Sequence, residues 1–429
     1  MKMETFNTIL LVILVALSLI LTAYVWTFQP NSLRSDQIVT EEPKTLDGEV
    51  KQLADIVQPE HVYVHNNNKH FIFSAKKKEQ AFEEELAQWT LTNTRTNSLD
   101  ELPETSIELV YPVAVSYSQL NALFQVEGGE NVTSNLGDGV FNRVYLKPNE
   151  DNTTSLIFVN ENQEDPLGDV VTATAARSII DIMNDGDLIS ALPLSDKNAW
   201  NQIYLPNSIQ VNDSNVRSET ISRSVFADIY MEEPSVRGSD QYIDTNRLKS
   251  VQFKNNGQAA SYNFLNSSSA RMGTTNRADQ LQAALNTINS HKGWTNDFNL
   301  FAVNGEGSYT FQFRMVRNGY PIFQTNGLSL LSIRMVSNLP DPVSYERTLL
   351  HLSATGKSDG AKTLEAQDVL EWLEENQYNK RDIQDVAIGY MLEENDTSAI
   401  YKYHMRPSWF VKSQGEWEEV EASDTGGES

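Results

Sequence analysis

Three histidines lie within ten positions of one another, in the stretch HVYVHNNNKHFIFS at His61, His65 and His70. Imidazole nitrogens are zinc ligands, so three of them on one hairpin could bind that metal. On a strand, His61 and His65 share one face with Tyr63, and His70 could lie across the hairpin. No nearby acid and no pattern of residues that would orient the imidazoles is evident. We therefore interpret all three as solvated strand histidines and predict no metal site.

The other candidate motifs lack part of their chemistry. In DIMNDGD, a calcium loop with Gly186 at its sixth position would place Met183 and Leu192 where oxygen ligands are needed. Ser74 and Lys77 match S-x-x-K, but no S-D-N or K-T-G partner occurs. G-x-S-x-G, P-loop and H-E-x-x-H motifs are absent, and so is cysteine. We predict a protein that is not an enzyme, with no catalytic residue and no cofactor.

Two alternatives stay open at this point. Pairs of carboxylates could come together from the 58 acidic residues, because the sequence does not show distances, and such a pair could act in a cell-wall hydrolase. A module that binds a peptide or another ligand ranks above the hydrolase, because exposed sheet edges accept additional strands.

The charge balance restricts the partners. The chain has 33 Lys and Arg residues against 58 Asp and Glu residues, a net charge of −25. Such a protein repels nucleic acid and anionic lipid headgroups. We therefore predict no nucleic-acid partner, and the composition identifies no small-molecule ligand.

Residues 6–28 form an apolar stretch without a charged side chain. At about 1.5 Å per residue this stretch is long enough for a helix that crosses a hydrocarbon core of about 30 Å. It lacks a small-x-small cleavage site and ends in Tyr24, Trp26 and Phe28, as at an aromatic interfacial belt. The flanking charges are positive before the stretch and negative after it. We predict a retained single-pass helix in the cell membrane, with a cytoplasmic N-terminus and an extracytoplasmic bulk.

Small and hydroxyl-bearing residues mark two sides of this predicted helix. Ser18 and Thr22 are four residues apart, and Ala16 and Ala23 lie roughly 140–160° around the helix from Ser18. Small residues let helix backbones approach, and hydroxyls can form hydrogen bonds across the contact. We predict that Ala16, Ser18, Thr22 and Ala23 contact partner helices, although the hydroxyls could instead bond their own helix.

The remaining chain alternates amphipathic helices with hairpins. Residues 76–91, 170–185, 218–231, 277–290 and 363–377 have helical patterns, and the last three each precede two strands joined by an Asn- or Gly-containing turn. We also expect Trp294 and Trp409, near the ends of repeated units, to be packed. Because each apolar helix face needs a sheet to cover it, we predict an α+β fold of antiparallel sheets with helices on one face.

The pattern suggests the following division of the chain. We predict a cytoplasmic tail at 1–5, a transmembrane helix at 6–28, a stalk at 29–49, an N-terminal α+β domain at 50–208, a middle α+β domain at 209–338, a C-terminal α+β domain at 339–420 and a disordered acidic tail at 421–429.

Several weak motifs in a particular order resemble the YycH family. They are LTAYVWTFQP, DIVQPEHVYVH, HFIFS, FADIYMEEPSVR, TINSHKGWT, VRNGYPIF and RPSWFV. The resemblance extends from the apolar stretch to about residue 420 and contains no catalytic signature. It implies three extracytoplasmic domains, of which the middle and C-terminal ones are alike in topology.

The resemblance also implies a function. Members of the family are single-pass accessory proteins of the WalK/WalR (YycG/YycF) two-component system of low-GC Gram-positive bacteria. A member would modulate the sensor histidine kinase WalK, which governs cell-wall metabolism, through its membrane helix and together with the partner protein YycI. The resemblance gives neither the sign of this regulation nor the signal.

Overall fold

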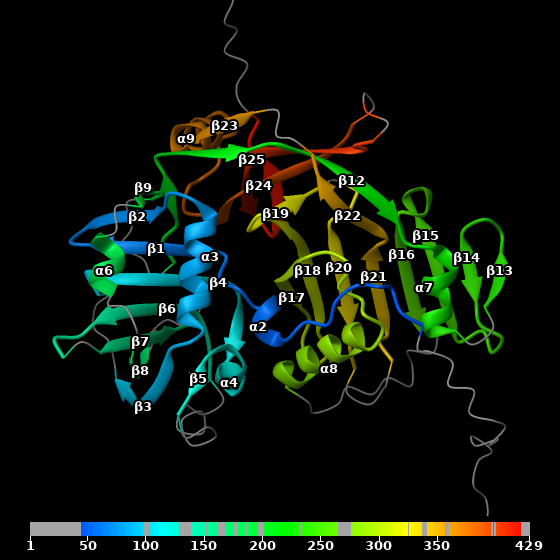
Figure 1. Cartoon of the computed structure of the whole chain (residues 1–429), viewed down its shortest axis with the longest axis horizontal. Helices are drawn as coiled ribbons and strands as arrows, with labels where there is room; N and C mark the ends of the chain where they lie inside the picture. The colour runs from blue at the N-terminus through cyan, green and yellow to red at the C-terminus, as the bar shows by residue number, and fades with distance from the viewer. Residues whose placement is uncertain are drawn as a thin grey trace, which may run out of the picture. The chain divides into compact units, whose positions relative to one another are not determined.

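The fold is described from a computed structural model. It describes residues 44–97, 103–127, 139–151, 153–160, 168–174, 179–184, 187–195, 201–231, 234–264, 276–324, 326–336, 341–356, 360–395, 398 and 400–421. The helices and strands that the structure describes all belong to one compact unit, Thr45–Ser429 (Figure 1). Two large sheets form most of this unit.

The first sheet has ten strands, all from the N-terminal half of the chain. In spatial order they are β10 (Tyr204–Pro206), β9 (Leu188–Pro193), β2 (Lys69–Phe73), β1 (His61–Asn66), β4 (Thr105–Ser116), β6 (Val140–Pro148), β7 (Thr154–Val159), β8 (Gly168–Thr174), β3 (Thr90–Asn97) and β5 (Gln125–Val126). The predicted β1–β2 and β6–β7 hairpins are confirmed. Asn67 and Asn68 join β1 to β2 with φ angles of 49° and 63°, which asparagine tolerates better than most residues.

Short helices accompany this sheet. They are α2 (Leu53–Ile56), α3 (Lys76–Leu86), η1 (Tyr117–Gln119), α4 (Leu120–Leu123) and α6 (Ile179–Asn184). The predicted apolar face of α3 is confirmed, because Phe82 and Leu86 are buried and Phe82 stacks on Phe73 of β2 at 5.7 Å between ring centroids. This contact fixes α3 beside the end of β2.

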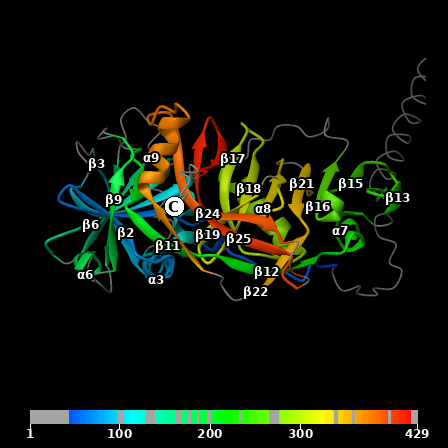
Figure 2. The same ribbon diagram turned by 90° about the horizontal axis from the view of Figure 1, so that it is seen from above.

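The second sheet has fourteen strands from the C-terminal half. Its path is β13 (Ser235–Arg237), β14 (Gln241–Ile243), β15 (Lys249–Lys254), β16 (Ala259–Phe264), β21 (Ser344–Thr348), β20 (Leu330–Arg334), β18 (Thr310–Arg317), β19 (Tyr320–Phe323), β24 (Ile383–Glu394), β25 (Tyr403–Ser413), β12 (Ser214–Thr220) and β22 (Leu350–Thr355), with β17 (Phe298–Asn304) on β18 and β26 (Glu416–Glu419) on β25. Beside it, β11 (Ser208–Asn212) pairs with β23 (Ala361–Glu365) to form a separate two-stranded sheet. Figure 1 labels β23, and Figure 2 labels β11.

Three helix-then-hairpin segments contribute to this sheet, as the sequence predicts. The helices are α7 (Arg223–Tyr230), α8 (Arg277–Ser290) and α9 (Ala366–Glu375), and the corresponding strand pairs are β15–β16, β17–β18 and β24–β25. Asn276 caps α8 by accepting a hydrogen bond from the Asp279 N–H at 2.8 Å. Trp294 and Trp409 are buried, with 2% and 3% of their surface exposed, so their predicted packing is confirmed.

Two of these segments meet through the parallel pair β19–β24, which the sequence pattern did not reveal. The pairing of these two strands depends on Gly389 of β24. A Cβ atom there would lie 2.7 Å from both the Phe323 ring and the Pro321 carbonyl oxygen of β19. Since real Cβ atoms do not approach other atoms so closely, glycine is what allows the two strands to pair.

Some helix limits predicted from the sequence are wrong. Residues 168–174 form strand β8 between β7 and β3, although we predict a helix from residue 170 onward. The physical reason is that Val170, Val171 and Thr172 are β-branched and fit a pleated surface. Similarly, residues 214–220 form β12, and the helix begins only at Arg223.

The described part of the predicted stalk is held against the unit. Leu46 is buried and its N–H donates to the His291 carbonyl oxygen at 2.9 Å. The Gly48 and Glu49 N–H groups likewise donate to the carbonyl oxygens of Lys292 and Trp294. Residues 46–49 therefore pack beside the C-terminal end of α8, whereas a stalk would make no such contacts.

The α+β class with mostly antiparallel sheets is confirmed. Strands from the ranges 209–338 and 339–420 alternate within the second sheet, for instance where β21 lies between β16 and β20. The domain boundaries given above stay a prediction.

Candidate functional site

His65 of the β1–β2 hairpin is buried and His61 and His70 are partly buried, so our interpretation of all three as solvated histidines is wrong. His65 has 6% of its surface exposed, and its Nε2 lies 2.8 Å from Oε2 of Glu108 on the neighbouring strand β4. Its Nδ1 lies 2.8 Å from Nδ1 of His70. The acid partner was missed because it comes from a strand 43 residues further along the chain.

Glu108 is the centre of a buried polar network. It forms an ion pair with Arg143 and accepts a hydrogen bond from the Tyr145 hydroxyl at 2.9 Å, and all these residues are buried. Burial alone would raise the pKa of Glu108, but the Arg143 charge and the hydrogen bonds from His65 and Arg143 lower it to about 2. Among the described residues, none of the buried side-chain nitrogen or oxygen atoms that lack a hydrogen-bond partner belongs to this network, so we assign the network a structural role.

We expect the network to make the protein unstable in acid. The pKa of Glu108 in the folded protein, about 2, lies below its ordinary value of 4.5. Its contribution to stability is therefore complete above pH 4.5 and is lost as the pH falls toward 2. The difference in unfolding free energy between the unmodified protein and Glu108→Gln should shrink over that range, by at most about 1.4 kcal/mol per pH unit.

Urea unfolding at a series of pH values measures this difference. Glu375→Gln, at an exposed position of α9, is the control and should behave as the unmodified protein at each pH. A gap between the unmodified protein and Glu108→Gln that stays constant down to pH 2 would contradict the assignment.

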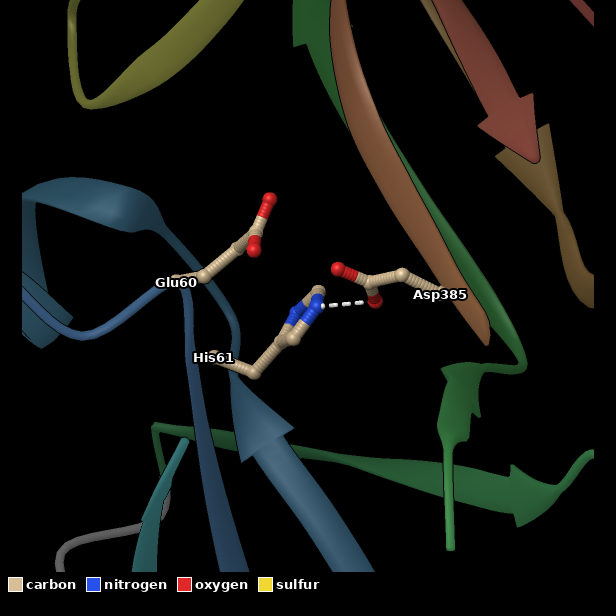
Figure 3. Close-up of side chains that lie close together, drawn as sticks. All are labelled: Glu60, His61 and Asp385. Atoms are coloured by element: carbon tan, nitrogen blue, oxygen red, sulfur yellow. Dashed lines mark hydrogen bonds and ion pairs between the residues drawn. The ribbon is translucent and has the colours of Figure 1, made fainter. Parts of the chain in front are cut away.

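A second cluster brings the two large sheets together. Glu60 directly precedes β1, His61 is the first residue of β1, and Asp385 lies near the start of β24 in the other sheet. Figure 3 shows the three side chains directed toward one another. His61 Nε2 lies 2.8 Å from Oδ1 of Asp385, and the ligand atoms of all three side chains lie within 4.8 Å of one another.

Local structure orients two side chains of this cluster, Asp385 and His61. The pairing of β24 with β25 shifts register between Ile383 and Asp385, an irregularity of the kind that redirects a side chain. The Val386 N–H donates to Oδ1 of Asp385 at 2.8 Å. The His61 ring stacks on Tyr63 at 5.5 Å with an interplanar angle of 9°. The cluster is thus held by backbone and aromatic contacts from both sheets.

Burial and mutual proximity shift the pKa values of the two carboxyl groups in this cluster in opposite directions. Burial and the neighbouring Asp385 charge raise the pKa of Glu60 to about 8. Burial opposes ionisation of Asp385 as well, but the His61 charge and hydrogen bonds from His61 and Glu60 lower its pKa to about 2. Because like charges repel, the ionised Asp385 disfavours ionisation of Glu60.

A cavity of about 620 Å³ adjoins the cluster at Glu60. Side chains of α2, α3, β17 and β18 line it, and among them is the buried Arg314. Its guanidinium lies over the rings of Phe301 and Phe323, 3.9 Å and 4.2 Å from their centroids. Burial lowers the pKa of Arg314 to about 9, and its Nε has no hydrogen-bond partner among the described residues.

Comparison with known proteins places this architecture in a family. The family model described as "YycH protein, N-terminal domain" matches residues 4–187, and the one described as "YycH protein, C-terminal domain" matches residues 200–426. The chain belongs to the YycH family. The resemblance seen in the sequence motifs is therefore confirmed over nearly the whole chain.

Relatives of this YycH-family chain are known from Bacillus subtilis. The "Two-component system WalR/WalK regulatory protein YycH" of strain 168 is 20% identical over 97% of this chain and 96% of its own length. The crystal structure of YycH from Bacillus subtilis superposes with a TM-score of 0.69 at 14% identity, and covers 87% of this chain and 98% of that one. This second comparison shows that the two chains share a fold.

The predicted contact residues of the membrane helix cannot be placed in this YycH-family fold. Ala16, Ser18, Thr22 and Ala23 lie outside the described residues. Within the ranges that the structure does describe, no helix is long and apolar enough to cross a membrane, and residues 6–28 are not among them.

The sequence reasoning missed Glu60 and Asp385. Glu60 could have been noticed, because it stands directly beside His61. Asp385 carries no such signal, since it is separated from His61 by 324 positions.

Proposed function

We propose that this protein is a non-enzymatic, single-pass membrane protein that modulates the WalK (YycG) sensor histidine kinase and thereby cell-wall metabolism. It acts through contacts of its membrane helix, together with a YycI-like protein. The N-terminus is cytoplasmic and the two sheets are extracytoplasmic. The observation that carries the proposal is the family match, which begins at residue 4 and so includes the apolar stretch 6–28.

The Bacillus subtilis relative supports the regulatory part of this proposal, because it is named a WalR/WalK regulatory protein. The charge of the chain supports a protein partner, since a net charge of −25 disfavours nucleic acid and anionic polymers. The buried polar network around Glu108 also supports a non-enzymatic role, because Arg143, Tyr145 and His65 all bind its carboxylate.

Replacing the apolar stretch by a poly-leucine helix is expected to abolish modulation of the kinase, while the protein remains in the membrane. Changing both Ser18 and Thr22 to leucine should weaken it, because each interhelical hydrogen bond in a membrane contributes about 0.6 kcal/mol. The measurement is a WalR-dependent transcriptional reporter, combined with crosslinking to WalK and to the YycI-like protein.

The matched control changes Leu17 and Leu21 to valine. These residues lie on neither of the two predicted contact faces, so the reporter should be unaffected. If poly-leucine leaves both reporter and crosslinks unchanged, the helix is only a tether and any regulation lies in the sheets.

One observation favours a second function, an extracytoplasmic ligand- or peptide-binding module. The cavity of about 620 Å³ has the size of a small-molecule site and contains the buried guanidinium of Arg314. Calorimetry of the full chain with wall-derived peptides tests it. Saturable binding that is lost in Arg314→Met would support the module, and the absence of binding would leave only the regulatory role.

A further inference from the structure

Glu60, His61 and Asp385 offer one nitrogen and two carboxylate groups to a common point. Their potential ligand atoms lie within 4.8 Å of one another, and all three residues are partly buried. They come from the beginning of β1 and from β24, so the point lies between the two large sheets (Figure 3).

The donor set is that of a transition-metal site. Calcium and magnesium prefer oxygen ligands alone, whereas zinc binds imidazole nitrogen and carboxylate oxygen at about 2.0–2.2 Å. Ligand atoms on a tetrahedral zinc ion are then about 3.3–3.5 Å apart. The separation of 2.8 Å between His61 Nε2 and Asp385 Oδ1 would have to open only slightly to admit the ion.

The surroundings of the three residues offer space for a water ligand and groups that orient the metal ligands. A cavity of about 80 Å³ is lined by both Glu60 and His61, so a water molecule can reach a fourth coordination position. The Val386 N–H donates to Oδ1 of Asp385, and Tyr63 fixes the plane of the His61 ring, as groups outside the coordination sphere do in zinc sites. Lys412 and Arg314 act electrostatically on Glu60 and therefore weaken its attraction for a cation.

We propose that Glu60, His61 and Asp385 bind one zinc ion that joins the first sheet to β24 of the second. His61 supplies Nε2, each carboxylate supplies one oxygen, and water completes the tetrahedron. Because the ligands come from both sheets, zinc would stiffen their junction. This site is independent of the regulatory role proposed above.

The experiment is equilibrium dialysis of the chelator-treated full chain in detergent against zinc, in a large excess of magnesium that masks the surface acids. We expect saturation at one zinc per chain. His61→Gln, Asp385→Asn and Glu60→Gln should each lower the affinity by more than about 100-fold, because loss of a direct ligand exceeds the 10–100-fold effect of groups outside the coordination sphere. Cobalt substitution should give the intense visible bands of a tetrahedral ion only when the three ligands are intact.

His404→Gln is the matched control. His404 also lies beside an aspartate, with Nε2 at 3.9 Å from Asp213, but belongs to no three-ligand group within the described residues. It should bind zinc as the unmodified protein does. Circular dichroism verifies that each variant is folded, and Glu60→Gln and Asp385→Asn preserve side-chain volume for this reason. The proposal is overturned if the unmodified chain shows no saturable binding, or if the folded ligand variants bind zinc as tightly as the control.

Discussion

Trp409→Ala is expected to lower the free energy of unfolding by about 3–5 kcal/mol, the range for truncating a buried tryptophan. Trp409 lies in β25 opposite Ile388 of β24, and only 3% of its surface is exposed. It also lines the cavity of about 80 Å³ beside Glu60 and His61. The truncation would therefore extend an existing cavity, and the walls of two paired strands cannot collapse to fill it.

Chemical denaturation of the two proteins measures the loss, and Trp409→Phe is the control. The indole Nε1 of Trp409 is buried and has no hydrogen-bond partner among the described residues. Phenylalanine keeps most of the ring contact and removes that unpaired donor, so it should cost less than about 1.5 kcal/mol. An equal loss in both variants would show that the indole has a specific partner and that simple packing does not explain its role.

Arg143→Met is expected to destabilise the protein by about 3–5 kcal/mol, because it leaves the buried Glu108 carboxylate without its main positive partner. Arg143 and Glu108 have 4% and 2% of their surfaces exposed. The Arg143 charge is the main favourable contribution that keeps the pKa of Glu108 low. Without it, Glu108 must either stay charged in a buried position or take up a proton.

The double variant Arg143→Met with Glu108→Gln separates charge from packing. It contains no uncompensated buried charge, so it should be more stable than Arg143→Met alone although it carries one more substitution. Urea denaturation of the single and double variants gives the coupling energy. Additive losses would mean that the two side chains do not stabilise each other.

Local elements of the fold could be predicted where apolar periodicity and turn residues agree. The faces of α3 and α8 and the hairpins β1–β2, β6–β7, β15–β16, β17–β18 and β24–β25 all follow from side chains close together in the chain. The prediction fails at residues 168–174, where an apolar run compatible with either structure becomes strand β8. Its hydrogen bonds to β3 and β7 decide the outcome.

Tertiary structure decided which of these elements meet. The parallel pairing of β19 with β24 and the position of β12 between β25 and β22 depend on contacts between strands far apart in the chain. Such pairings reflect the summed burial of many side chains, so no local pattern encodes them.

In the candidate site, too, some features follow from the sequence and others only from the tertiary structure. By itself, the sequence determined the family through ordered motifs, the acidic charge balance and the three histidines on one hairpin. Only the folded chain brought Glu108 to His65, and Asp385 to His61 across 324 positions. The physical reason is that the chemistry of an imidazole depends on the acid within about 3 Å of it, and strand pairing sets that distance.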